Sequence, residues 1–291
     1  MADEPKFSIC QFTTNRLTFQ EDLDVYVKSG VAGIGICESK LPTDRDDEMV
    51  ERFEASGLTA TVCIPQAAMV LPSKLGGPRD PQERIQMLCD GIRRLARFNP
   101  ARIVLVTGPA GTMQIDEARR IAINGLRLAA QTAAEYHIPV GLEPLHAEVL
   151  GDCTMISTIP ETLEMIDQIG HLNVGILFDV YHLWDTPDIL EKIVEHAHLF
   201  GDGIHINDWR QPPRSWADRV LPGEGTMDLP ALLNALEAGG FDGWYDLEIF
   251  SDDGTHGNAY PDSLWKLDPL DVVRRGKAGF MRAWQARRAP A

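Results

Sequence analysis

Residues 174–208 read VGILFDVYHLWDTPDILEKIVEHAHLFGDGIHIND, and this stretch decides the fold. Its two ends, Val174–Val180 and Gly203–Asp208, are short apolar runs of the kind found in buried strands. The segment between them has apolar residues at helical spacing, and Thr186-Pro187 places a proline at the expected first helical position. Strand, helix and strand in this order form the unit from which parallel sheets are built.

The same alternation runs along the whole chain, and Thr158 with Glu161 forms a capping box for another expected helix. Eight such units of roughly 30 to 40 residues fill the chain, which is the usual size of an eightfold (β/α) barrel. We therefore predict an α/β fold, a (β/α)8 TIM barrel with a single domain over residues 1–291. The expected strands are Phe7–Thr13, Ala32–Glu38, Thr59–Ile64, Arg102–Thr107, Pro139–Pro144, Val174–Val180, Gly203–Asp208 and Trp244–Ile249.

An open, doubly wound sheet is the alternative architecture. Such a sheet normally carries a Gly-rich phosphate-binding loop after its first strand. The residues QFTTNRL (11–17) at the end of the first expected strand contain no glycine. The sequence therefore favours the barrel.

The charge of the chain excludes one class of partner. The net charge is −16, and residues 272–291 contribute six positive charges and no acid, so residues 1–271 carry −22. Such a surface repels phosphate backbones, and we expect no nucleic-acid partner. Residues 272–291 are expected to form a basic C-terminal helix and tail, which could contact a second copy of the chain or a partner subunit.

The apolar runs and the cysteines indicate where the protein works. No run approaches eighteen consecutive apolar residues and the start MADEPKF is not a signal sequence, so we expect no membrane contact and a cytoplasmic location. The five cysteines are odd in number and form no C-x-x-C pair, which favours buried reduced thiols.

Acidic and imidazole side chains stand where the last four expected strands end. Glu143, Asp179, His205 and Glu248 are separated by 36, 26 and 43 residues, about one unit each, and barrel strands end at a common rim. Asp246 could replace Glu248, because alternate strand residues point to the same side. Buried carboxylates at this spacing repel each other unless a divalent cation neutralises them. Oxygen ligands with one imidazole favour Mn²⁺ or Mg²⁺, with Co²⁺ or Zn²⁺ able to substitute.

Five motifs in the second half carry a family resemblance. They are E-P-L at 143–145, the D-x-x-H of Asp179 and His182, H-I-N-D at 205–208, L-P-G-E-G-T-M-D-L-P at 221–230 and G-W-Y-D-L-E-I-F at 243–250. With them the chain resembles the xylose isomerase-like barrel superfamily over nearly its whole length. That superfamily includes ketose 3-epimerases, hydroxypyruvate isomerase, inosose dehydratase, 3-dehydroshikimate dehydratase and the larger subunit of C-glycoside deglycosidases.

The resemblance implies roles for individual residues. The four rim residues named above would be the metal ligands, and His182 would contact the substrate. An arginine that follows the histidine of the seventh strand would also reach the substrate. Arg210 is the better positional match for it, and Arg214 is the reserve. Trp209, which directly follows the rim, is a candidate platform for stacking on a sugar.

The chemistry expected of this site is isomerisation or epimerisation of a keto-sugar or a related hydroxycarbonyl compound. Both reactions remove a proton next to a carbonyl, and a metal acting as Lewis acid stabilises the resulting enediolate. Glu143 and Glu248 would be the base and the acid, as the ketose 3-epimerases suggest. The substrate would be a small sugar or sugar-derived ketone.

His146 departs from the family pattern, which usually has asparagine at this position. An imidazole beside the metal is a candidate acid or base at neutral pH. It suits a lyase, either a dehydratase or an enzyme that cleaves 3-keto-glycosides or C-glycosides, and this is the second hypothesis. A third, cleavage of damaged DNA as in a related metal-barrel family, is disfavoured by the negative charge.

Overall fold

The computed structural model describes residues 4–150 and 153–287. Its strands are β1 (Phe7–Cys10), β2 (Gly33–Gly35), β3 (Thr59–Ala60), β4 (Val62–Cys63), β5 (Arg102–Leu105), β6 (Val140–Leu142), β7 (Val174–Ile176), β8 (Gly203–Ile206) and β9 (Trp244–Leu247). Its α-helices are α1 (Phe19–Ser29), α2 (Asp46–Ser56), α3 (Pro81–Ala96), α4 (Ile115–Ala134), α5 (Ala147–Leu150), α6 (Ile159–Ile169), α7 (Val180–Leu183), α8 (Ile189–His196), α9 (Leu229–Ala238) and α10 (Pro269–Ala286). Short 3-10 turns lie at Gln11–Thr14, Glu38–Lys40, Ala197–Leu199 and Leu264–Lys266.

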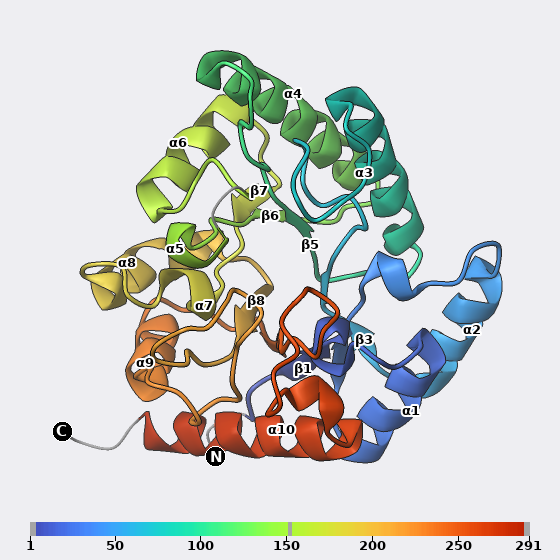
Figure 1. Ribbon diagram of the computed structural model, residues 1–291, viewed down its shortest axis with the longest axis vertical. Helices are drawn as coiled ribbons and strands as arrows, with labels where there is room; N and C mark the ends of the chain where they lie inside the picture. The colour runs from blue at the N-terminus through green and yellow to red at the C-terminus, as the bar shows by residue number, and fades with distance from the viewer. Residues whose placement is uncertain (1–3, 151–152, 288–291) are drawn as a thin grey trace.

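The strands form a parallel barrel with the helices around it (Figure 1). One sheet has the order β3-β2-β1-β9-β8 and the other β4-β5-β6-β7. The sheets meet at Thr61, where the third expected strand divides, because Thr61 donates its amide to Ile34 while its carbonyl accepts from Arg102. They meet again where Asp179 pairs with His205. The predicted (β/α)8 barrel is confirmed.

The alternation of side chains along each strand separates two apolar layers. Ile103 and Leu105 of β5 belong to the large core between the strands and the helices. Val104, between them, faces the inside of the barrel and packs with Val62 and Leu177. These inner side chains fill the barrel below the carboxyl ends of the strands. The rim at those carboxyl ends is left for polar side chains.

Arg102 fills the interior near the amino end of β5. Its side chain is buried, and Nη2 donates to the carbonyl oxygens of Val140, at 3.2 Å, and Leu199, at 3.3 Å. A Cβ atom on Gly141 or Gly175 would lie 2.6 or 2.7 Å from the guanidinium. Glycine is therefore needed at both positions to admit the arginine.

A local capping signal sets the start of α6 but not that of α8. Thr158 accepts from the amide of Glu161, whose carboxylate accepts from Thr158 in return, so the predicted capping box of α6 is present. The predicted start of α8 at Pro187 is wrong. Asp188 lies in the left-handed region at φ 58°, so the helix begins only at Ile189.

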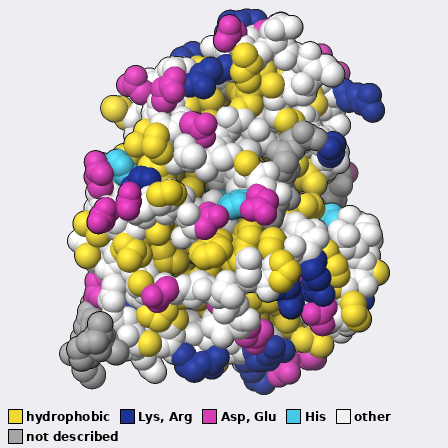
Figure 2. Space-filling model, turned by 60° about the vertical axis from the view of Figure 1, so that its left-hand side comes forward, with side chains coloured by type: hydrophobic (Ala, Val, Ile, Leu, Met, Phe, Trp, Pro, Cys, Tyr) yellow, Lys and Arg dark blue, Asp and Glu magenta, His cyan; other side chains and the backbone are white. Residues whose placement is uncertain are grey.

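Helices α8 and α9 leave an apolar groove on the outer surface. Leu190 and Val194 of α8 are 42% and 45% exposed, and Glu191 and Glu195 lie beside them. Figure 2 turns this side of the molecule forward and shows apolar side chains gathered among acidic ones. None of the helices within residues 4–150 and 153–287 is both long and apolar enough to cross a membrane.

Candidate metal centre and active site

The barrel brings the four predicted metal ligands together at the carboxyl ends of its strands. Glu143 follows β6, Asp179 precedes α7, His205 lies in β8 and Glu248 follows β9. Their exposed fractions are 7%, 0%, 1% and 4%. His205 Nδ1 lies 3.5 Å from Glu143 Oε1 and 3.5 Å from Glu248 Oε2. Ligand atoms of Asp179, His205 and Glu248 all lie within 4.8 Å of one another.

His205 has the environment of a metal ligand. Among the described residues, neither ring nitrogen has a hydrogen-bond partner, although both are buried. Burial opposes protonation of this ring, but Glu248, Glu143 and Asp179 together raise its pKa to about 10. A positive charge is therefore strongly favoured among these carboxylates, and a divalent cation could supply it in place of the proton.

His182 offers a second possible ligand set, with Glu143 and Asp179. Its Nδ1 accepts the backbone amide of His146 at 3.0 Å, which places the ring proton of the neutral imidazole on Nε2. Burial lowers the pKa of His182 to about 3, so the ring is neutral. A nitrogen that carries a proton cannot bind a metal, so the geometry favours the set with His205. His182 instead presents an N–H donor 3.7 Å from Asp179 Oδ2.

The carboxylates of Glu143 and Asp179 differ in their surroundings. Burial raises the pKa of Glu143 to about 7, although His205 opposes the shift. Burial also opposes ionisation of Asp179, but Arg219, His182 and His205 outweigh it and lower its pKa to about 2. Asp179 is further fixed through Oδ1, which accepts the amide of Tyr181 at 2.8 Å. Asp179 is thus a permanently charged, rigid group, while Glu143 can hold or release a proton near neutral pH.

Arg219 lies among the predicted ligands, although the sequence did not single it out. Its Nη1 lies 2.8 Å from Asp179 Oδ2 and 2.7 Å from Glu248 Oε2. It stands fourteen residues after His205, and one residue, Val220, separates it from the L-P-G-E-G motif. That nearness to the motif was the available signal, whereas position relative to the histidine pointed to Arg210.

His146 lies beside the ligand set and is held from two sides. Its Nε2 lies 3.2 Å from Asp185 Oδ2, and its ring centroid lies 5.1 Å from that of Trp209. Its Nδ1 is buried without a hydrogen-bond partner among the described residues. The carboxylate of Asp185 thus orients the imidazole through Nε2, and Nδ1 is available for another contact.

The model of the xylose isomerase-like TIM barrel family matches residues 23–274, which is most of the chain. The chain belongs to this family.

Two solved structures share the fold of this chain. A protein of Sinorhizobium meliloti 1021 superposes with a TM-score of 0.81 at 26% identity, over 96% of this chain and 98% of the other. The IolI protein, solved with a bound zinc atom, superposes with a TM-score of 0.77 at 20% identity over 98% and 100%.

Among curated relatives, an inosose isomerase of Bacillus velezensis is 28% identical over 144 residues, 46% of this chain and 48% of the other. The chain spans about half the length of the curated relatives that it matches.

Two residues predicted to bind substrate have other partners in this xylose isomerase-like chain. Arg210 Nε lies 3.0 Å from Asp218 Oδ1, and Arg214 Nε lies 2.7 Å from Asp218 Oδ2. Both arginines also pair with Asp262. They join the loop after β8 to the loop after β9, and their contact with a substrate stays a prediction.

The prediction that Trp209 is a stacking platform is corrected. Its side chain is 3% exposed, and its ring packs on Tyr181, Trp184 and His146 at centroid distances of 4.9, 5.6 and 5.1 Å. Its Nε1 donates to Gln211. The ring therefore has no free face for a sugar. The Trp209 ring packs against the imidazole of His146 and helps to hold it in place.

Asp246, the alternative ligand, points into the barrel below the rim. Its Oδ2 accepts from Thr61 Oγ1 at 3.1 Å and would lie 2.2 Å from a Cβ atom at Gly35. Glu248 lies one strand alternation closer to the rim and has an oxygen 3.5 Å from His205. The geometry therefore favours Glu248.

Proposed function

We propose that this protein is a divalent-metal-dependent isomerase or epimerase of a small keto-sugar or related hydroxycarbonyl compound. The observation that carries the proposal is the set of three buried carboxylates around His205, whose two ring nitrogens have no hydrogen-bond partner among the described residues. The name inosose isomerase, printed for a relative that the chain matches over about half of its length, agrees with the proposal.

Glu143, Asp179, His205 and Glu248 would hold the cation. Mn²⁺ is the first choice, because a mainly oxygen donor set with one imidazole suits it, and the zinc atom of the IolI structure shows that a fold relative accepts a divalent ion. When bound, the cation would polarise the carbonyl of the substrate and lower the pKa of the neighbouring carbon.

The proton transfers would be carried by the two glutamates. Glu143 and Glu248 come from β6 and β9 and approach His205 Nδ1 with one oxygen each, at 3.5 Å. A substrate bound above the ligands would meet one carboxylate on each face. Glu143 would remove the proton next to the carbonyl, and Glu248 would return one to the opposite face, while the Nε2 proton of His182 would orient a substrate oxygen.

A lyase on the same scaffold is the second candidate, and the pair of His146 with Asp185 favours it. A carboxylate 3.2 Å from an imidazole holds the ring in one orientation, as a general acid or base requires. Elimination needs such a group to protonate the leaving substituent. Asparagine at this position, as in the epimerases that the chain resembles, could not do so.

One experiment separates the two candidates. The protein with Mn²⁺ is incubated in D₂O with keto-sugars, inososes and 3-keto-glycosides, and the products are followed by NMR and mass spectrometry. Deuterium incorporation without loss of a substituent indicates an isomerase or epimerase, and release of water or an aglycone indicates a lyase. His146→Asn should retain deuterium exchange in the first case and abolish elimination in the second.

The metal ligands are tested by their own variants. We expect Glu143→Gln and His205→Asn to lose at least about tenfold in Mn²⁺ affinity and most of the activity, because each removes a donor from the set. Metal content after dialysis and calorimetric titration measure the effect. Glu195→Gln, an exposed acid on α8, is the matched control. Full metal content in both ligand variants would refute the assignment.

A further inference from the structure

Arg219 contacts the oxygens that the proposed cation would need. Its Nη1 lies 2.8 Å from Asp179 Oδ2 and 2.7 Å from Glu248 Oε2, and its side chain is 3% exposed. One nitrogen thus bridges two of the four predicted ligands. A buried guanidinium at this distance neutralises part of the charge of the carboxylates, and it also repels any second cation on the same oxygens.

Aromatic rings hold the guanidinium in place. Its central carbon lies 4.3 Å from the ring centroid of Tyr181 and 5.0 Å from that of Phe250. The rings offer their electron-rich faces to the cation, so the side chain is stabilised even without full contact with both carboxylates.

The backbone at Arg219 is anchored independently of the ligand set. Its amide donates to the carbonyl of Phe250 at 2.9 Å, and the neighbouring Val220 exchanges two hydrogen bonds with Asp208. The loop therefore stays in place when the contacts of Nη1 change. Any adjustment to a cation falls on the arginine side chain.

We propose that Arg219 is a built-in counter-cation of the metal centre. When no metal is bound, its guanidinium stabilises the carboxylates of Asp179 and Glu248. When a divalent cation enters, the contacts of Nη1 with these two carboxylates become weaker. The inference rests on the proposed metal site. Beyond holding the metal, the site would then use this one residue to balance the stability of the metal-free protein against its affinity for the metal.

The test compares Arg219→Met with the wild type after stripping both with a chelator. The change removes the positive charge and keeps most of the length of the side chain. We expect a lower unfolding temperature of the metal-free protein, because buried carboxylates lose their partner. We also expect roughly tenfold tighter Mn²⁺ binding by calorimetry, because the repulsion is gone.

Arg84→Met is the matched control. Arg84 is also buried, but the partners of its guanidinium among the described residues are carbonyl oxygens, those of Met69, Gly76 and Pro78. Its loss should lower the unfolding temperature and leave the Mn²⁺ affinity unchanged.

Unchanged or weaker Mn²⁺ binding by Arg219→Met would overturn the inference. If that variant does not fold, the wild type with ¹⁵N-labelled arginine is titrated with Zn²⁺. The guanidinium resonances of Arg219, assigned with Arg219→Lys, should shift and exchange faster with water, and unaltered resonances at saturation would equally overturn it. Failure of the metal site itself looks different, because wild type, Arg219→Met and His205→Asn would then all fail to bind Mn²⁺.

Discussion

Asp22 is a buried carboxyl outside the active site, and its neighbours make it a test of the electrostatics of the fold. Its oxygens accept from Gln11 Nε2 at 2.7 Å, Thr14 Oγ1 at 2.5 Å and Lys40 Nζ at 2.8 Å. Burial raises its pKa to about 6, and Lys40 opposes the shift only in part. The folded protein therefore holds a proton at pH values where the unfolded chain has released it.

This difference predicts the sign of a pH effect. Because the folded state binds more protons between about pH 4 and 6, the free energy of unfolding should fall as the pH rises through this window. Relative to Asp22→Asn, the wild type should lose about 3 kcal/mol from pH 4 to pH 7, since two pKa units correspond to this energy. Denaturant unfolding at several pH values measures it.

The exposed neighbour Asp24 supplies the control, because Asp24→Asn should follow the wild type at every pH. A constant difference between wild type and Asp22→Asn would contradict the prediction.

At the scale of residues, the sequence predicted positions better than partners. Glu143, Asp179, His205 and Glu248 could be found because strand ends are visible in the hydrophobic pattern and barrel strands end at one rim. Only nearness to the L-P-G-E-G motif separates Arg219 from Arg210 and Arg214, because all three lie in one long loop whose path no periodicity describes. The burial of Trp209 was hidden for a related reason, since its covering rings come from the two preceding units.

Among the elements, the loop after β8 depends most on one side chain. Asp208 Oδ1 accepts the amides of Trp209, at 2.8 Å, and Met227, at 3.0 Å. Its Oδ2 accepts the amides of Gly223, at 2.9 Å, and Gly225, at 3.1 Å. A Cβ at Gly225 would lie 2.3 Å from Oδ1, so this glycine is required for the close approach.

We expect Asp208→Asn to destabilise the protein by about 2–4 kcal/mol, because the amide group of asparagine cannot accept the hydrogen bonds that one carboxylate oxygen now receives. Limited proteolysis should also cut within residues 209–227 sooner than in the wild type. Glu224→Gln, an exposed change on the same loop, should do neither. Resistance of the loop in Asp208→Asn would show that other contacts hold it.

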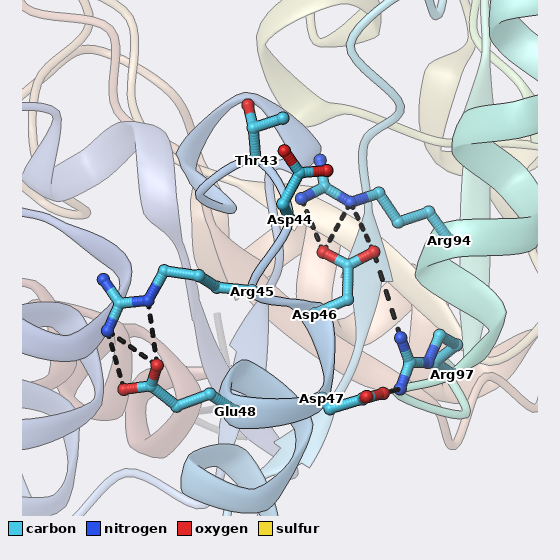
Figure 3. Close-up of a pocket in the computed structure, with 8 residues that line it drawn as sticks. All are labelled: Thr43, Asp44, Arg45, Asp46, Asp47, Glu48, Arg94 and Arg97. Atoms are coloured by element: carbon cyan, nitrogen blue, oxygen red, sulfur yellow. Dashed lines mark hydrogen bonds and ion pairs between the residues drawn. The ribbon is translucent and has the colours of Figure 1, made fainter.

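A second prediction for an element concerns the contact of α2 with α3. Arg94 Nε lies 2.9 and 3.0 Å from the two carboxylate oxygens of Asp46 (Figure 3). Its Nη2 donates to the carbonyl of Pro42 at 2.7 Å. Arg97 pairs with Asp47 beside it. We expect Arg94→Met to lower the free energy of unfolding by about 1–2 kcal/mol, because it removes a paired, partly buried guanidinium.

Arg93 provides the comparison for that measurement. It pairs with Asp90 on the same helix, but the two side chains are 44% and 61% exposed. Arg93→Met should therefore change the free energy of unfolding by less than about 0.5 kcal/mol. Equal losses in the two variants would argue against a special role for the Arg94 cluster.

Elements with local signals were predicted well, and elements with tertiary causes were not. The capping box of Thr158 and Glu161 depends on four consecutive residues and is present. The start of α8 depends on Asp188, whose left-handed conformation delays the helix past Pro187. The division of the third strand at Thr61 arises because its two halves pair with different strands, which only the closed barrel decides.

For the whole molecule, the distribution of charge predicts a negative result. With a net charge of −16, the protein should not bind duplex DNA that contains an abasic site at physiological salt concentration. A gel-shift or anisotropy titration checks this with and without Mn²⁺. Retention that persists at this salt concentration would revive the DNA-cleavage hypothesis.

Finally, the pairing of Asp179 with His205 lies on the junction between the two sheets. There the amide of His205 donates to the carbonyl of Phe178 at 3.0 Å, and the side chains on either side are two of the proposed ligands. A bound cation would therefore link the two sheets at a junction that is formed by a single bridge between strands. Metal binding would then strengthen the closed barrel as well as complete the site.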